Sequence, residues 1–461
     1  MPVARTPHIS AVRSFHLPID RIRTDRRASA TRTPGVRHPI TWRSHVEALT
    51  MCLAGVVAGL AVMVPVDYRW LSHGSALELQ MLVSNIPFAT AAAALAAVVT
   101  AVLCGVGQPR LGWLVAWVSM TLLLIGHLIA GGLTDGLVTS GFADAITGGV
   151  VIGALAAVAA GRSRAVIGLL LGSLSGIVIG NVTPLPAGEQ FHSIVRWALL
   201  DPPPLPLIVT ATALLGWCAW RHRLREEPGV EPTEIPLRPV VAALVLVVAA
   251  LARSEWTAGH PHWVVQLAAG VVLTVFATLV AAFLLPAREG ILVSLAVAFG
   301  AAGNIIAAVP RPEWTIPLLV VAVAGGLGAG HRWPVPAAAV AATIMLAVFA
   351  TMTDGAAGTV SAAGGVAVAA IGGYCFGTAV PQQFPSVAIT MLFVPTVVVT
   401  VIGHRPVARG DDAAMWFRGT PPSDWGPGWT AVAITVGCGA ISLVLHRMRP
   451  VGRESHTLSA A

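Results

Sequence analysis

The sequence contains no lysine, and all 28 of its basic residues are arginine. Charge of either sign is scarce, because Asp, Glu, Lys and Arg make up 11% of 461 residues, whereas soluble domains carry about 25%. Hydrophobic residues make up 56% of the chain, and its mean hydropathy is +0.78. A chain this poor in charge lacks the polar surface of a water-soluble globule, so that class is excluded.

Cysteine is also scarce, and no two cysteines have the C-x-x-C spacing of a metal or redox site. The five cysteines lie within or at the ends of apolar runs, where we expect small buried side chains rather than a disulfide framework: Cys52, Cys104, Cys218, Cys375 and Cys438. His260 and His262 flank a proline, but no third ligand lies near them, so we predict no metal site.

The sequence lacks the motifs of the common hydrolases and nucleotide-binding proteins. No Walker loop, G-x-S-x-G, H-E-x-x-H or EF-hand pattern occurs. We therefore expect that the protein is not an enzyme and needs no cofactor.

Long apolar runs fill most of the chain. A helix of about 17–25 residues crosses about 30 Å of hydrocarbon, and a helix satisfies its own backbone hydrogen bonds there. The sequence thus predicts an all-α polytopic membrane protein with about 14 transmembrane helices, at 46–66, 87–106, 112–132, 143–161, 165–183, 204–220, 238–252, 263–285, 290–309, 314–330, 333–353, 360–380, 384–403 and 429–447.

The arginines sort strongly to one side of these fourteen runs. Nine lie in the first 45 residues, and twelve more fall on the same side: Arg110, Arg162, Arg164, Arg221, Arg223, Arg225, Arg238, Arg288, Arg332, Arg447, Arg449 and Arg453. Seven fall on the other side: Arg69, Arg196, Arg253, Arg311, Arg405, Arg409 and Arg418. By the positive-inside rule, both termini are predicted to be cytoplasmic.

This distribution also bears on partners and location. The net charge of +7 and the pI near 10.1 come from arginines in short loops and in the N-terminal tail, so we expect a lipid bilayer and no nucleic acid as partner. The absence of lysine beside abundant Ala, Gly, Val and Arg is typical of a high-GC bacterium. We therefore expect a multi-pass protein of the inner cell membrane.

Weak internal repeats divide the chain into two six-helix halves. Thr134, Asp135 and Gly136 recur as Thr353, Asp354 and Gly355, 219 residues later, and Arg110 and Arg332 are 222 residues apart. The predicted organisation is 6+2+6: a disordered arginine-rich cytoplasmic tail (1–45), an N-terminal half (46–220), a cytoplasmic linker (221–237), an inserted helix pair (238–285), a C-terminal half (290–447) and a C-terminal tail (448–461). Two such halves with a central site between them are typical of secondary transporters.

Four local patterns resemble those of the fourteen-helix drug/proton antiporter branch of the major facilitator superfamily. Residues 105–112 resemble the inner loop G-x-L-A-D-R-x-G-R-R, with Pro109 in place of the acid. Residues 161–165, followed by glycines at every fourth position from Gly168 to Gly180, are similar to the family's inner turn and glycine-rich fifth helix. Residues 196–202 resemble the R-W-x-F-x-x-N-x-P stretch, and Asp144 stands where the family has the arginine of R-x-x-Q-G.

The resemblance implies a secondary active transporter that works by alternating access. An interior with few charges favours a small apolar or amphipathic compound as the exported substrate. Proton coupling stays open, because 48–64 lacks the acid that the family often carries in its first helix. The alternative is a non-transporting membrane scaffold or assembly subunit built on a degenerate transporter fold, whose protein partner the sequence leaves unknown.

Two titratable residues within apolar runs are candidates for a substrate or ion pathway. His127 could relay protons or bind substrate, or it could hydrogen-bond a neighbouring carbonyl. Asp144 could face a cavity and exchange a proton, or it could be the N-cap of its helix.

Four other residues complete the candidate set. Asn181 and Asn304 either line the pathway or tie helices together. Arg110 and Arg332 either bind helix-end carbonyls and lock an inward-closed state, or act only as topology signals.

Overall fold

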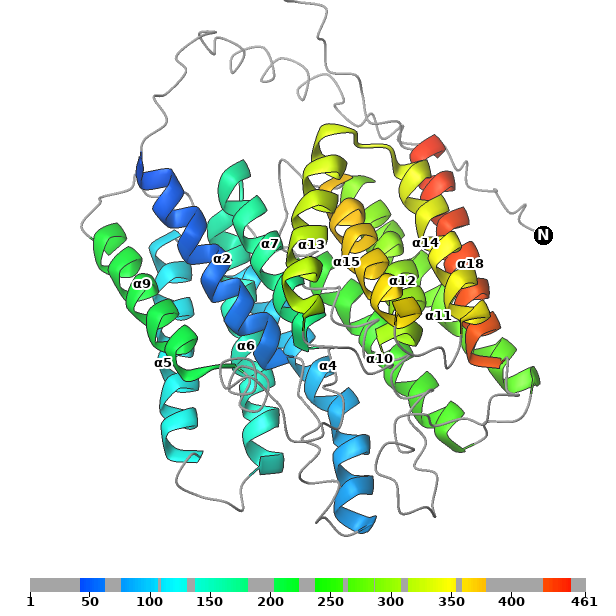
Figure 1. The fold of residues 1–461 in the computed structure, drawn as a ribbon, viewed down its shortest axis with the longest axis horizontal. Helices are drawn as coiled ribbons and strands as arrows, with labels where there is room; N and C mark the ends of the chain where they lie inside the picture. The colour runs from blue at the N-terminus through cyan, green and yellow to red at the C-terminus, as the bar shows by residue number, and fades with distance from the viewer. Residues whose placement is uncertain are drawn as a thin grey trace, which may run out of the picture. The chain divides into compact units, whose positions relative to one another are not determined.

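The computed structural model describes residues 42–62, 76–106, 109–130, 137–180, 203–223, 237–259, 264–285, 287–307, 314–353, 359–378 and 426–448. Within these ranges the chain forms thirteen α-helices and no strand (Figure 1). The prediction of an all-helical protein is confirmed for this part of the chain.

The first six helices span residues 42–223. They are α2 (Trp42–Val62), α4 (Ala76–Val106), α5 (Pro109–Ala130), α6 (Leu137–Ala159), α7 (Ser163–Gly180) and α9 (Leu205–Arg223).

Seven helices follow. They are α10 (Leu237–Gly259), α11 (Val264–Leu284), α12 (Ala287–Ala307), α13 (Thr315–Arg332), α14 (Pro336–Met352), α15 (Thr359–Thr378) and α18 (Gly426–Met448).

Eight of these helices contain segments long and apolar enough to cross a membrane: Ser44–Val62, Phe88–Val106, Pro109–Ile129, Phe142–Ala159, Ser163–Gly180, Val264–Leu284, Thr315–Arg332 and Gly428–Met448. Three shorter apolar helices accompany them, at Glu289–Gly303, Pro336–Met352 and Ala362–Thr378. The fold is therefore that of a multi-pass helical membrane protein.

Helix limits differ from the apolar runs where polar residues continue a helix. Thirteen of the fourteen runs fall on these helices, and the run at 384–403 lies outside the described residues. Helix α4 begins at Ala76 rather than near 87, and α10 continues to Gly259 rather than ending near 252. The reason is that hydropathy detects apolar composition, whereas a backbone helix continues through any residue that tolerates helical geometry.

Several sequence expectations fall outside the described residues. They include nearly all of the N-terminal tail, most of the linker at 221–237, the C-terminal tail from 449, and the repeated Thr134–Gly136 segment together with Asp354 and Gly355.

Glycines bring α4 and α6 into backbone contact. A Cβ added at Gly149 or Gly153 would meet the carbonyl oxygen of Ala93 or Ala97, respectively. Small residues four apart allow such an approach between membrane helices, so α4 and α6 form a close pair.

Helices α13 and α15 form a second close pair in the same manner. A Cβ added at Gly373 or Gly377 would meet the carbonyl oxygen of Val323 or Leu327, respectively. Both pairs thus place two glycines, four residues apart, against two carbonyls that are also four residues apart.

Helix α7 makes a third contact of this type, with α2. A Cβ added at Gly168, Gly172 or Gly176 would meet the carbonyl oxygens of Ala48, Cys52 and Val56 in turn. The glycine repeat that the sequence shows in 168–180 is therefore a packing seam.

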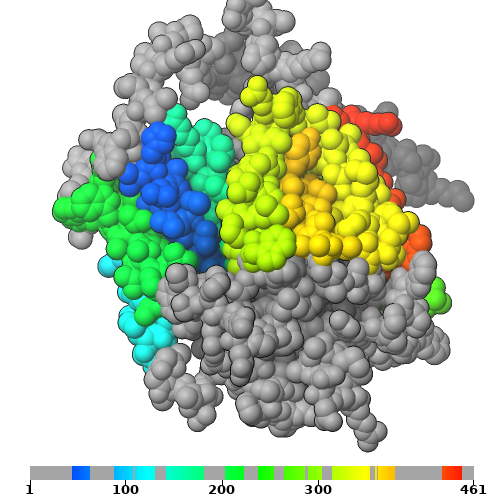
Figure 2. Space-filling view, in the orientation of Figure 1, coloured from blue at the N-terminus to red at the C-terminus, as the bar shows by residue number. Residues whose placement is uncertain are grey.

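The remaining contacts connect these pairs into one bundle. Helix α5 packs against α6 and α9, and α14 packs against α15 and α18. Helix α12 contacts α14, α15 and α18, while α10 and α11 pack on each other and against α4, α12 and α18. Figure 2 shows α13, α15 and α14 side by side on one face.

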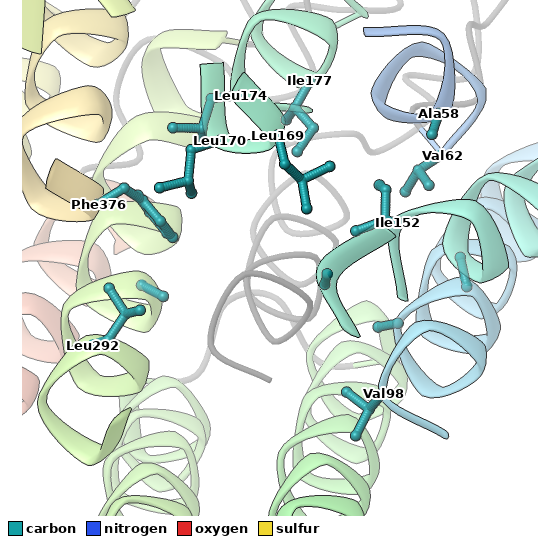
Figure 3. Close-up of a cluster of buried hydrophobic side chains, with 14 of the residues drawn as sticks. Ala58, Val62, Val98, Ile152, Leu169, Leu170, Leu174, Ile177, Leu292 and Phe376 are labelled. Atoms are coloured by element: carbon teal, nitrogen blue, oxygen red, sulfur yellow. The ribbon is translucent and has the colours of Figure 1, made fainter. Parts of the chain in front are cut away.

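Different faces of α7 lie toward two different groups of helices. Figure 3 shows Leu169 and Ile177 on the side of Ile152, which belongs to α6. Leu170 and Leu174 instead point toward Leu292 of α12 and Phe376 of α15 (Figure 3). All of these side chains are buried, so this boundary between the two groups is apolar.

Candidate functional site

The structure brings together two of the residues that the sequence singles out, His127 and Asp144. His127 lies in the last turn of α5, and Asp144 lies on α6 beside it. The Nδ1 atom of His127 is 3.8 Å from Oδ2 of Asp144, and the two side chains are 12% and 21% exposed. Two titratable groups from neighbouring helices thus share one half-buried site.

The hydrogen bonding of His127 determines what this pair can do. Its Nδ1 atom lies 3.3 Å from the carbonyl oxygen of Leu123, which can only accept a hydrogen bond. Nδ1 therefore carries the hydrogen of the neutral ring, and Nε2 is the atom that takes up a second proton. The resulting imidazolium would form an ion pair with Asp144.

Small and polar residues lie close to Asp144. Gly126 faces its carboxylate, since a Cβ added there would lie 3.9 Å from Oδ1. One turn further along α6, the hydroxyl of Thr147 donates to the carbonyl oxygens of Ala143 and Asp144. A distance of 3.9 Å is an ordinary van der Waals contact, so Gly126 and the carboxylate lie side by side.

The N-cap alternative for Asp144 is wrong. Helix α6 begins at Leu137, so Asp144 lies two turns inside the helix. The alternative for His127, a hydrogen bond to a neighbouring carbonyl, agrees with the Leu123 contact. That bond uses Nδ1 and leaves Nε2 available, so a proton-relay role for His127 stays a prediction.

The two candidate gating arginines differ in position: one lies at the start of a helix and the other at the end of one. Arg110 is the second residue of α5, whereas Arg332 is the last residue of α13, and both side chains are exposed. The guanidinium of Arg332 lies 5.6 Å from the ring centroid of Trp333, a distance typical of a cation–π contact. Their roles in gating stay predictions.

The asparagine candidates are not brought into the site by the described residues. Asn181 lies outside them. Asn304 lies near the end of α12, and its side chain is not described.

A second titratable site, which the sequence analysis missed, lies at the opposite end of α5. Glu47 of α2 accepts hydrogen bonds from Arg162, in the turn between α6 and α7, and from His222 of α9. The distances are 3.3 Å from Arg162 Nη1 to Oε2 and 3.2 Å from His222 Nε2 to Oε1. We call these three residues the Glu47 cluster.

The ring of His222 is buried and stacked. Its side chain is 4% exposed, and its ring stacks on Trp113 at 5.5 Å between centroids with an interplanar angle of 14°. Among the described residues, its Nδ1 atom has no hydrogen-bond partner. Glu47 is therefore the hydrogen-bond partner that holds this ring, through Nε2.

Further contacts connect the helices at this end. The Sγ of Cys218 on α9 lies 3.7 Å from the hydroxyl of Thr50 on α2, and Arg164 donates to Ser44 at 3.0 Å. A single acid at the start of an otherwise uncharged apolar run, and the Arg-His-Arg sequence at 221–223, were the sequence signals available for this cluster.

Arg253 corrects the expected distribution of arginines. Arg253 follows the apolar run predicted at 238–252 and was expected on the outer side, but it lies inside α10 and is 2% exposed. Its Nη1 donates to the hydroxyl of Thr274 on α11 at 3.2 Å, and its aliphatic stem passes over Gly270. Arg253 therefore ties the α10–α11 pair together and is no topology signal.

Within the described residues, no three His, Cys, Asp or Glu side chains form a group that could hold a metal ion. His260 and His262 lie outside the described residues. Cys104, Cys218, Cys375 and Cys438 are buried and Cys52 is half-buried, and all five are free thiols.

Comparison with known proteins adds no functional assignment. No protein-family model matches the chain, and no curated protein matches it significantly.

Proposed function

We propose that this protein is a secondary active transporter, with both termini cytoplasmic, which exports a small apolar or amphipathic compound by alternating access. The observation that carries the proposal is the equivalent packing of two sets of helices. The α4–α6 pair and the α13–α15 pair meet through glycines at the same spacing, and α5–α9 corresponds to α14–α18.

Side-chain contacts extend this equivalence to a further pair. Thr50 and Cys218 connect α2 to α9, and Ser294 and Ser442 connect α12 to α18 at 2.6 Å between hydroxyl oxygens. A 6+2+6 layout, with α10 and α11 as the inserted pair, accounts for both sets. Repeated halves of this kind are the architecture of alternating-access transporters.

The boundary at α7 supports movement of one set against the other. Leu170 and Leu174 of α7 point toward Phe376 of α15 there (Figure 3). An interface of apolar side chains lets two groups of helices rock without breaking ion pairs, and it favours an apolar or amphipathic substrate over a charged one.

The His127–Asp144 pair is the proposed proton-coupling site. It lies within the apolar helices α5 and α6, where ionisable residues usually have a functional role. Protonation of His127 would create an ion pair with Asp144, so proton uptake changes the interaction between two helices.

Asp144→Asn is expected to abolish proton-driven export while the protein remains folded. Inverted membrane vesicles containing the full-length protein would be energised with a pH gradient whose acidic side is the vesicle interior. Uptake of ethidium, acriflavine and Nile red would then be measured. Loss of the acid should reduce gradient-driven uptake by about a hundredfold, which is the low end of the effect of removing a proton-transferring group.

Thr121→Ala is the matched control on α5. The Thr121 hydroxyl donates to the Trp117 carbonyl of its own helix, so its removal should leave uptake unchanged. Export that persists in Asp144→Asn would reject the coupling site. No uptake of any probe by the wild-type protein, with a stoichiometric copurifying partner instead, would favour the scaffold alternative.

A further inference from the structure

Glu289 is a buried acid that the proposed transport site does not use. It lies in the first turn of α12 and is 5% exposed. Among the described residues, no hydrogen bond or ion pair to its carboxyl is present. Burying an ionised carboxylate without a partner is strongly unfavourable, whereas burying the neutral acid costs much less.

The internal repeat pairs Glu289 with Glu47. Residues 47–54 read E-A-L-T-M-C-L-A, and residues 289–296 read E-G-I-L-V-S-L-A. The glutamate, the small Cys52 or Ser294 and the following Leu-Ala occupy the same places, so the two acids hold equivalent positions at the starts of α2 and α12.

The partner helices are equivalent too. His222 and Arg223 of α9 correspond to His446 and Arg447 of α18, 224 residues later, and Cys218 corresponds to Ser442 with the same offset. The contacts of Ser294 with Ser442 and of Ala298 with Thr435 show that α12 and α18 run antiparallel. At about 1.5 Å rise per residue, Glu289 and His446 therefore lie at nearly the same level of the bundle.

The two halves differ in how the acid is neutralised. Glu47 has Arg162 and His222 against it. Residues 379–403, the counterpart of the segment that carries Arg162, contain no basic residue. His446 is exposed and forms no described ion pair with Glu289.

We propose that Glu289 is a proton-binding site. In this structure it is the neutral acid, and it occupies the position in the C-terminal half that ionised Glu47 occupies in the N-terminal half. The ligand is a proton taken from the end of the bundle that carries the Glu47 cluster. This inference does not depend on transport, because its tests measure protonation and stability.

Other titratable groups on the helices around Glu289 are few. Helix α18 contributes Cys438, His446 and Arg447, and α15 contributes Tyr374 and Cys375. Helices α11 and α14 contain no titratable residue, and Arg288 is its neighbour on α12. A pH response lost specifically on removal of Glu289 can thus be assigned to this carboxyl.

The first test compares Glu289→Gln with Glu47→Gln in thermal unfolding of the full-length protein in nanodiscs, from about pH 5 to about pH 8.5. If the fold holds Glu289 neutral, the folded state keeps a proton that the unfolded state releases, so this contribution to stability declines as the pH rises. The Tm of Glu289→Gln relative to wild type should therefore rise with pH by at least about 2 °C.

Glu47→Gln should lack this trend. Glu47 is paired with Arg162 and His222, and a carboxylate held by such partners is ionised in the folded and the unfolded state alike above about pH 5. The Tm of this variant relative to wild type should therefore change little across this range. The same trend in both variants, or no pH dependence for Glu289→Gln, would overturn the proposal.

The second test uses the wild-type protein, so it does not depend on a variant folding. Dicyclohexylcarbodiimide reacts with protonated carboxyls in apolar surroundings, and peptide mass spectrometry locates the adduct. At neutral pH, Glu289 should be modified and Glu47 should not. Modification of Glu47 without Glu289, or of neither residue, would show that Glu289 is not a neutral acid in this fold.

Discussion

Gly326→Ala is expected to destabilise the protein by about 3 kcal/mol, at the upper end of the range for overpacking by one methyl group. A Cβ at this position on α13 would meet the carbonyl oxygen of Ala370 and the amide of Tyr374 on α15. These are backbone atoms in the middle of a helix, so they cannot move aside as the tip of a side chain can. The two helices would have to separate along their whole contact.

Two other glycines of α13 provide the control. Gly325 and Gly328 have no atom within 4 Å of an added Cβ. Alanine at either position should therefore raise stability, by up to about 1 kcal/mol, because it reduces the conformational freedom of the unfolded chain. Thermal unfolding of the three purified variants would measure the difference, and equal effects at all three positions would contradict the α13–α15 packing.

Glu47→Ala is expected to cost about 3 kcal/mol at neutral pH, the low end of the range for breaking a buried ion pair, because the Glu47 and Arg162 side chains are partly exposed. The change removes the acceptor of both Arg162 and His222, and His222 is too deeply buried to find water instead. Helices α2 and α9 and the α6–α7 turn should loosen together. Because the His222 ring stacks on Trp113, tryptophan fluorescence would report the change.

A double-mutant cycle separates this network from a general loss of packing. Glu47→Ala and Arg162→Ala should be non-additive by about 1 kcal/mol or more, since they remove the same interaction. Arg164→Ala should change stability by no more than about 0.5 kcal/mol, because its contact with Ser44 is exposed. Additive effects of the first pair would argue against the cluster.

The equivalent helices α2 and α12 differ in how their first acid is neutralised. Glu47 and Glu289 each lie near the start of their helix, but only Glu47 has a histidine and an arginine against it. If Glu289 is the neutral acid proposed above, proton release there would act on the contacts of α12 and leave those of α2 unchanged.

Part of the candidate site could be predicted from sequence. His127 and Asp144 are noticeable because each is a titratable residue inside an apolar run, where such residues are expensive. Their contact was not predictable, because it depends on the last turn of α5 lying against α6 two turns beyond its start. Glu47 was overlooked because it stands at the start of the apolar run at 46–66, and its partners are 115 and 175 residues away.

The sequence by itself determined the helical, membrane-spanning character of this protein and the approximate position of thirteen helices. Both follow from local apolar composition, because a backbone in hydrocarbon must satisfy its hydrogen bonds within each segment. Only the tertiary structure decided which helices meet, that Arg253 is buried, and that Glu47 is paired whereas Glu289 is not. Those outcomes depend on the rotation and register of whole helices against one another, which glycine contacts and interhelical hydrogen bonds set and which hydropathy does not encode.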